Sequence, residues 1–360
     1  MLLTRASSLL QLVTWSCSIP SLILNILLTL AIRRERRTDN RFRWFNSIFL
    51  YSVYSNTLLS IFFPLFHPTF VPARGLIYIV FIGPLAGVMP MVLVRIAHSL
   101  LLGLITYQAC ISPITLVLRW LVARKYVLKL RSDSEDTTPF RHLSCTALYY
   151  KNVRVLFAVT AIPFPVAIEL YMNLVEKSEK LNFYTEKSHE NAVWKLTKGS
   201  YPYIVIDWNF LYLMLTFTIP YLIFFLISLL FHRFYMKSIR NVPNDSIDMG
   251  YNDASTINQT LLSMALQNFV LISLPHLFLD ISVFIHWQLG VRALPVTFGC
   301  ILVSLTNAAT LFIHFRAYRR QVGFLFIEFL RHNNVNIPLF VMNQQQQSTH
   351  FQMSVIGGNA

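Results

Sequence analysis

The chain has 360 residues, of which 55% are hydrophobic, 14% aromatic and only 13% charged, about half the charged share of a soluble globular protein. Its net charge of +14 would suit nucleic-acid binding, but the basic residues form short clusters between long apolar runs. This pattern argues against a nucleic-acid partner and favours an integral membrane protein with basic cytoplasmic loops. Four cysteines are too few for a disulfide scaffold.

Eight apolar stretches approach the length of about 20 residues that a helix needs to cross a bilayer. Residues 76–94 are separated from the next stretch by Arg95 alone, and glycines and prolines between 83 and 90 favour turns. We therefore expect a hydrophobic loop there. The sequence predicts an all-α integral membrane bundle of seven transmembrane helices, at about 9–32, 44–66, 92–118, 153–173, 203–231, 261–285 and 293–315.

The basic residues orient these helices. If the N-terminus lies outside, the cytoplasmic segments 33–43, 119–152, 232–260 and 316–360 contain 20 of the 30 Lys and Arg residues, and the outer segments contain 9. Cytoplasmic loops are enriched in Lys and Arg, so we expect the N-terminus outside and the C-terminus inside.

The chain after the seventh predicted helix divides into two parts. Residues 316–331 alternate basic and apolar side chains, which predicts an amphipathic helix along the inner leaflet. Residues 332–360 include a run of four glutamines, which predicts a disordered cytoplasmic tail. Residues 1–331 would then form one seven-transmembrane domain.

The sequence contains no motif for catalysis or for cofactor binding. It has no Gly-rich phosphate loop, no His-Glu-x-x-His, no Gly-x-Ser-x-Gly and no cysteine pair at metal-binding spacing. We expect neither enzymatic activity nor a cofactor or bound metal.

Ionisable side chains inside the predicted spans are the best functional candidates, because such groups are costly in a bilayer. They come from four helices and lie towards the outer side. They predict an outward-facing ligand pocket lined by Arg95, His98, Glu169, Asp207, His276 and Asp280. His276 and Asp280, four residues apart, would share one face of the sixth helix. Alternatively, long side chains such as Arg95 and Glu169 reach the lipid headgroups and bind nothing.

Prolines interrupt three of the predicted helices. Pro113 lies in the third, Pro220 in the fifth and Pro275 in the sixth. Proline removes a backbone hydrogen bond and kinks a helix, so these positions are predicted hinges.

This architecture resembles that of G-protein-coupled receptors. Leu118-Arg119-Trp120 ends the third predicted helix where rhodopsin-like receptors carry Asp-Arg-Tyr, and Asn25 and Pro275 resemble residues of helices 1 and 6. The chain departs from that family elsewhere. Its second helix has no Asp, its seventh reads Asn307-Ala308-Ala309-Thr310-Leu311 in place of Asn-Pro-x-x-Tyr, and residues 174–202 have no Cys.

The same combination is similar to the nematode serpentine chemoreceptors. Ile19-Pro20-Ser21-Leu22-Ile23-Leu24-Asn25 resembles the class gamma group, and Phe315-Arg316-Ala317-Tyr318-Arg319 resembles their Tyr-Arg endings. The resemblance implies a sensory receptor in the plasma membrane, including that of sensory cilia. It implies a small-molecule or pheromone-like ligand and coupling to a heterotrimeric G protein through Arg119 and nearby basic residues, including Arg124, Lys125, Arg233 and Lys237.

Two other classes of membrane protein stay open. A seven-span ligand-gated channel of the insect odorant-receptor type has its N-terminus inside, against the charge distribution. A transporter would more typically place a carboxylate near the bilayer midplane, and a membrane-embedded enzyme or lipid transporter would carry a His-rich or carboxylate cluster near an interface. The midplane of this chain carries mainly neutral polar residues, including Asn56, Thr106, Tyr107, Thr216 and Asn307.

The topology predicts where glycans are absent. The sequons at Asn244 and Asn258 both fall in the third predicted inner loop, whereas glycosylation occurs in the lumen. We expect no glycosidase-sensitive shift in electrophoretic mobility. A shift that disappears in Asn244→Gln would invert the topology and favour the channel.

Overall fold

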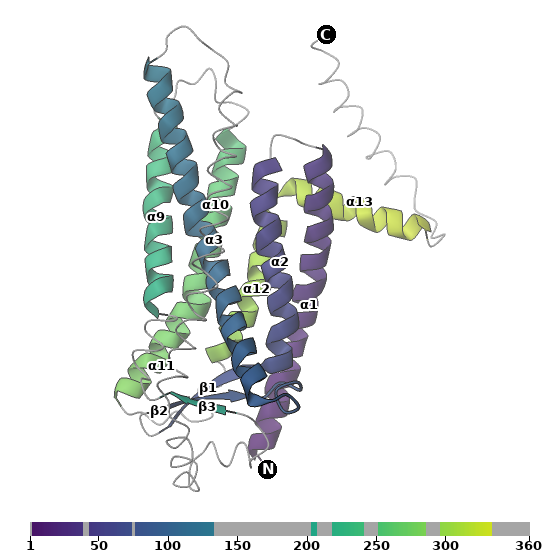
Figure 1. Ribbon diagram of the computed structural model, residues 1–360. Coiled ribbons are helices and arrows are strands. Elements are labelled where there is room, and N and C mark those ends of the chain that lie inside the picture. Colours follow the sequence, from purple (N-terminus) through teal and green to yellow (C-terminus); the bar gives the residue numbers. More distant parts are fainter. Residues whose placement is uncertain are drawn as a thin grey trace.

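The computed structural model describes residues 2–38, 43–73, 76–132, 203–206, 218–240, 251–285 and 296–332 (Figure 1). The helices are α1 (Leu2–Thr38), α2 (Arg43–Phe66), α3 (Met91–Ser132), α9 (Ile219–Arg240), α10 (Tyr251–Asn268), the π-helical turn η4 (Phe269–Ser273), α11 (Leu274–Phe284), α12 (Phe298–His314) and α13 (Arg316–His332). The strands are β1 (Pro68–Ala73), β2 (Leu76–Phe81) and β3 (Tyr203–Ile206).

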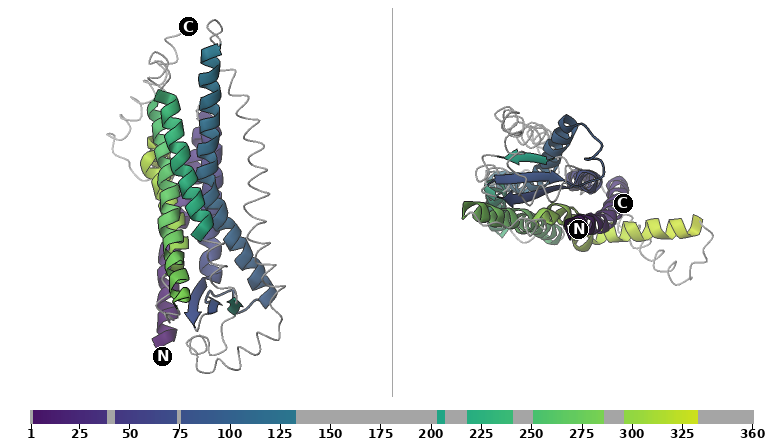
Figure 2. Two further views of the ribbon diagram at one scale, coloured as in Figure 1. Left: turned by 90° about the vertical axis from the view of Figure 1, so that its left-hand side faces the viewer. Right: turned by 90° about the horizontal axis from the view of Figure 1, so that it is seen from below.

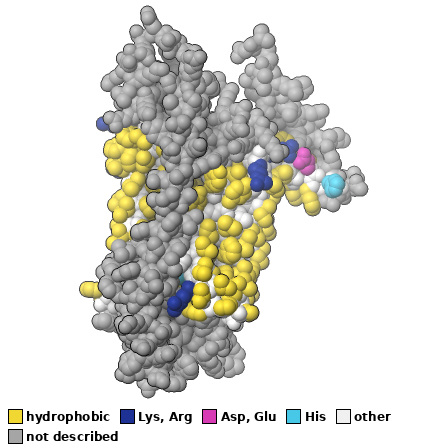
Figure 3. Space-filling model, in the orientation of Figure 1, with side chains coloured by type: hydrophobic (Ala, Val, Ile, Leu, Met, Phe, Trp, Pro, Cys, Tyr) yellow, Lys and Arg dark blue, Asp and Glu magenta, His cyan; other side chains and the backbone are white. Residues whose placement is uncertain are grey.

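Within these ranges, five helical stretches are long and apolar enough to cross a membrane, and the bent pair of α12 and α13 would make a sixth. One of the five, Ser255–Phe284, runs through α10, η4 and α11. Hydrophobic side chains cover much of the described surface between the two ends of the bundle (Figure 3). The protein is therefore a helical membrane protein. The predicted fourth span, 153–173, and the tail, 332–360, lie outside the described residues.

The helices run between two ends that differ in structure. The three strands and the start of α1 lie at one end, here called the sheet end (Figures 1 and 2). α13 and the C-terminal ends of α1, α3 and α9 lie towards the opposite end, here called the α13 end. Along α1, exposed apolar side chains recur every three or four residues and form a stripe suited to lipid contact: Leu9, Leu12, Trp15, Ile19, Ile23, Ile26 and Leu30.

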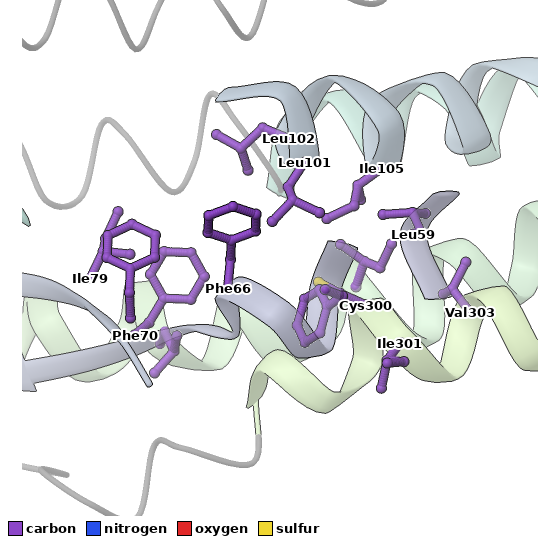
Figure 4. Close-up of a cluster of buried hydrophobic side chains, with 14 of the residues drawn as sticks. Leu59, Phe66, Phe70, Ile79, Leu101, Leu102, Ile105, Cys300, Ile301 and Val303 are labelled. Atoms are coloured by element: carbon purple, nitrogen blue, oxygen red, sulfur yellow. The ribbon is translucent and has the colours of Figure 1, made fainter. Parts of the chain in front are cut away.

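Two hydrophobic clusters fill the bundle. The cluster at the sheet end joins side chains of α2, α3, α12 and the sheet, including Phe66, Phe70, Ile79, Leu101, Cys300 and Ile301 (Figure 4). The cluster nearer the α13 end includes Leu28, Phe49, Leu116, Leu261, Leu311 and Tyr318. Along each of α1, α2 and α12, buried polar residues separate the two clusters.

The polar layer between the clusters ties α1, α2 and α12 together. The hydroxyl oxygens of Ser21, Ser60 and Ser304 lie 2.8 to 2.9 Å apart, one from each helix. Ser304 also donates to the Asn56 carbonyl at 2.9 Å, and Asn25 donates to the Ser21 carbonyl at 2.7 Å. Small serine side chains let the helices approach closely, which favours packing in lipid.

The described part of the chain is almost entirely helical, as predicted, but a three-stranded antiparallel sheet that the sequence analysis did not predict closes one end. β1 pairs with β2 from Pro68 opposite Phe81 to Ala73 opposite Leu76, and β2 pairs with β3. The loop predicted at 76–94 contains β2 and a turn before α3 begins at Met91. Its apolar run is rich in β-branched and aromatic residues, which favour strands.

The helix predicted at 203–231 is also wrong at its start. Tyr203–Ile206 is strand β3, residues 207–217 lie outside the described ranges, and the described helix is α9, Ile219–Arg240. Ile204, Val205 and Ile206 are β-branched, and they pair with β2 because that strand offers an open edge beside them. Hydropathy alone does not separate so short a strand from the end of a span.

The turn after β2 caps α2. The amides of Gly83 and Leu85 each donate at 3.1 Å to the carbonyls of Phe66 and Leu65, which have no partner within the helix. A Cβ atom on Gly83 would lie 2.2 Å from the Leu65 oxygen, so this approach requires glycine. The hairpin is thereby fixed to the end of α2.

The three predicted hinge prolines occupy different positions. Pro113 lies within α3, whose ribbon bends part way along its length (Figure 2). Pro220 lies in the first described turn of α9. Pro275 lies in the first turn of α11, directly after η4, and it has no N–H to donate to the Leu271 carbonyl. The π-helical turn is closed by the Leu274 amide, which donates to the Phe269 carbonyl.

α13 turns away from α12 by 96° at Phe315. Gln321 donates to Glu35 at 2.8 Å, Arg34 forms an ion pair with Glu328 at 2.8 Å, and Tyr318 donates to Asn46 at 2.7 Å. α13 therefore docks against α1 and α2. Its exposed face carries Phe326 and Phe329, as an amphipathic helix at a membrane surface would.

The packing of α12 against η4 gives a stability prediction. A Cβ atom on Gly299 would lie 1.6 Å from the Leu271 carbonyl oxygen, whereas one on Gly323 would meet nothing within 4 Å. We expect Gly299→Ala to lower the free energy of unfolding by about 1–3 kcal/mol, as overpacking does, and Gly323→Ala to leave it unchanged or raise it. Thermal unfolding of the purified protein in detergent measures both. Equal midpoints for the two variants would contradict this packing.

Candidate functional site

The structure describes four of the six predicted pocket residues. His98 of α3 and His276 and Asp280 of α11 are fully buried, and Arg95 of α3 is partly buried. Glu169 and Asp207 lie outside the described residues. His276 and Asp280 both lie on the buried side of α11, so neither of these two side chains points towards the surrounding lipid.

Asp280 is a buried carboxylate at the contact between α11 and the start of α9. Its Oδ2 accepts a hydrogen bond of 2.7 Å from the Thr218 hydroxyl, and its Oδ1 is buried without a hydrogen-bonding partner. Ser273 of η4 donates to the Thr218 carbonyl at 3.3 Å, which gives a second link to the residue directly before α9. Asp280 therefore holds the start of α9 while keeping one acceptor oxygen available.

The two predicted histidines pack against the sheet. The His276 ring meets Phe70 of β1 edge-on, with 5.4 Å between ring centroids, and the His98 ring meets Phe81 of β2 in the same way. His276 Nδ1 lies 2.6 Å from the Ile272 carbonyl, so Nδ1 carries the proton. The sheet thus rests on aromatic rings from α3 and α11.

His67, which sequence reasoning missed, lies at the junction of α2 and β1. It has a positive φ of 38°, which is uncommon for a residue with a side chain, and it is fully buried. Its Nδ1 lies 3.3 Å from the Thr14 hydroxyl, which itself donates to Leu10, so Nδ1 donates. Nε2 is buried without a hydrogen-bonding partner. Because burial penalises the charged ring, the pKa of His67 falls to about 4.

At the α13 end, Arg119 is buried between α3 and α9. Its guanidinium donates to the Tyr235 hydroxyl at 2.9 Å and lies over the Tyr235 ring, 4.7 Å from the centroid. Arg119 of α3 thus contacts α9 through Tyr235. Arg233 and Lys237 are exposed on α9, and Arg124 and Lys125 lie on α3, where the structure describes only their backbone.

The polar layer extends to α3 and α10. Gln108 donates to the Ser52 carbonyl at 2.7 Å, Asn268 donates to the Gln108 carbonyl at 3.4 Å, and Asn307 donates to Asn268 at 3.4 Å. Of this layer, sequence analysis had singled out Asn25, Asn56 and Asn307. The other residues of this layer could have been found from the sequence, because they are polar residues in the middle of otherwise apolar helices.

Comparison with known proteins identifies no relative, since no family model matches the chain and no curated protein matches it. The functional assignment must therefore rest on the residues of this chain.

The burial of His67 predicts a dependence of stability on pH. The folded-state pKa of about 4 lies below the usual value near 6.5, so the unfolded chain binds more protons between these values. Stability from this group is complete above pH 6.5 and is lost as the pH falls towards 4, by about 2 kcal/mol between pH 7 and pH 5.

The matched variant is His67→Asn, because Asn tolerates a positive φ and does not titrate. Thermal unfolding midpoints at pH 7 and pH 5 should differ less in the variant than in the parent protein. His98 and His276 are present in both proteins, so their contributions cancel in the comparison. Identical pH dependence in the two proteins would show that His67 does not act in this way.

Proposed function

We propose that the chain is a chemosensory G-protein-coupled receptor of the nematode serpentine type. It would have seven membrane spans, its N-terminus and the sheet end outside, and the α13 end in the cytoplasm. It would act in the plasma membrane, including that of sensory cilia. A small-molecule or pheromone-like ligand would bind at the sheet end, and a heterotrimeric G protein at the α13 end.

The path of the chain supports the seventh span. α3 ends towards the α13 end, whereas β3 lies at the sheet end (Figure 1). Residues 133–202 therefore connect opposite ends of the bundle. One membrane crossing by the predicted span 153–173 would satisfy this requirement. Added to the five apolar helical stretches and the bent pair of α12 and α13, it would give seven spans.

The position of the basic helix ends supports the orientation. The ends of α1, α3 and α9 that carry basic residues, together with α13, gather at one end of the bundle. Juxtamembrane Lys and Arg are enriched on the cytoplasmic side. The sheet end then faces outward.

The observation that carries the coupling proposal is the buried contact of Arg119 with Tyr235. A guanidinium desolvated between two helix ends stabilises one arrangement of those ends, and a change in their spacing exposes it. Arg233 and Lys237 are exposed on α9, within two residues of Tyr235, where they can contact an acidic surface of a partner protein. The proposed coupling site thus combines one buried contact between α3 and α9 with exposed basic side chains nearby.

α9 physically connects the two ends. It begins beside Thr218, which binds Asp280, and it carries Tyr235 roughly 25 Å further on, given the rise of an α-helix. A ligand that changes the Thr218–Asp280 contact would shift α9 and therefore the Arg119–Tyr235 contact. The ligand acts by binding one of the two arrangements more tightly.

Signalling should depend on Arg119. In cells exposed to a mixed panel of odorants and pheromones, Arg119→Ala should reduce G-protein activation by about ten- to a hundredfold, the usual size of coupling between two sites. Tyr235→Phe, which keeps the ring and removes the hydroxyl, should give a smaller loss. Surface expression is measured in parallel.

The control for this experiment is Lys237→Ala, which removes an exposed charge from the same helix end. It should change activation much less than Arg119→Ala. If Arg119→Ala instead lost surface expression in proportion to signalling, Arg119 would be a membrane anchor. Ion currents without G-protein activation would favour the channel, and substrate uptake would favour a transporter.

A further inference from the structure

We propose that the ligand carries a primary or secondary ammonium group and that this group binds Asp280 through its Oδ1 oxygen. The inference rests on the proposed function for the existence of a ligand at the sheet end, and it adds the chemical class of that ligand.

The first observation is the half-used carboxylate. Asp280 is fully buried, Oδ2 accepts one hydrogen bond from Thr218, and Oδ1 has no partner. An ionised carboxylate offers about four acceptor positions, so a single neutral hydroxyl leaves most of them unused. A buried carboxylate in this state favours a further donor, and a cationic donor forms the stronger and shorter bond.

The second observation is the distribution of charge. Across the residues that the structure describes, the one ion pair is Arg34 with Glu328, near the α13 end of the bundle. No described Lys or Arg lies within ion-pair distance of Asp280. Since a buried charge is costly unless it is paired, a bound cation would offset the cost of burying Asp280.

The third observation is the surroundings of the carboxylate. His276, one turn before Asp280 on the same face, packs against Phe70, and Leu279 and Val283 belong to the hydrophobic cluster at the sheet end. Aromatic faces attract cations, and an apolar enclosure excludes the water that would weaken the ion pair. This combination suits a compact amine with an apolar body. A carboxylic acid would be repelled by Asp280.

The test uses the purified full-length protein in detergent micelles, without a G protein. The probes are alkyl and arylalkyl primary amines, each paired with its N-acetyl derivative and with the carboxylic acid of the same skeleton. A ligand that binds the folded state raises the thermal unfolding midpoint. We expect at least one amine to raise it by several degrees at millimolar concentration, and its neutral and acidic counterparts to leave it unchanged.

Two variants locate the effect. Asp280→Asn keeps an oxygen acceptor for Thr218 but removes the charge, and it should abolish the shift. Glu328→Gln removes one exposed carboxylate at the other end and should retain it. If Asp280→Asn does not fold, Asp280→Glu keeps the charge on a longer side chain and should weaken amine binding about tenfold or more, which corresponds to 1.4 kcal/mol.

Three results would overturn the inference: no stabilisation of the parent by any amine, equal stabilisation by an amine and its N-acetyl derivative, or an unchanged shift in Asp280→Asn. The first would indicate a carboxyl group that is protonated and needs no cation. Because the assay contains no G protein, amine binding without G-protein activation in cells would contradict the proposed function and leave the amine site standing.

Discussion

In the core of a bilayer, polar groups cannot form hydrogen bonds with water, so they are stabilised by hydrogen bonds within the protein. The serine contact of Ser21, Ser60 and Ser304 meets this requirement at the point where three helices cross. It also sets how closely α1, α2 and α12 approach, because only short side chains allow hydroxyls from three helices to meet at 2.8 to 2.9 Å. The serine contact fixes the spacing of the three helices, and a hydrophobic cluster packs on each side of it, one towards each end of the bundle.

The two ends differ in the chemistry of their buried charges. Towards the α13 end a cation, Arg119, is held by a tyrosine through both its hydroxyl and its ring, whereas towards the sheet end an anion, Asp280, is held by a threonine. Both partners belong to the segment that includes α9. This helix is therefore the element whose displacement would alter both buried charges at once, while α1, α2 and α12 remain tied together by the polar layer.

Sequence analysis anticipated the helical membrane character and the position of His276 and Asp280 on one helix face, because hydropathy and helical periodicity are local properties. It missed what depends on residues far apart in the chain. Strand β3 pairs with β2, which lies more than a hundred residues earlier in the chain, and His67 is hydrogen-bonded to Thr14 of α1. Tyr235 and Thr218 likewise acquire their roles only from Arg119 and Asp280 on other helices.

The π-helical turn η4 has a consequence for the direction in which the side chains of α11 point. Such a turn holds one residue more than an α-helical turn, and each residue rotates the chain by about 100°. Removing a single residue between Phe269 and Ser273 would convert the turn to α-helix and rotate His276 and Asp280 together by that angle, away from α9 and β1. The direction of two buried side chains thus depends on the length of a five-residue segment that precedes them in the chain. A change in the length of this segment would alter the chemistry of the site more than most substitutions within it.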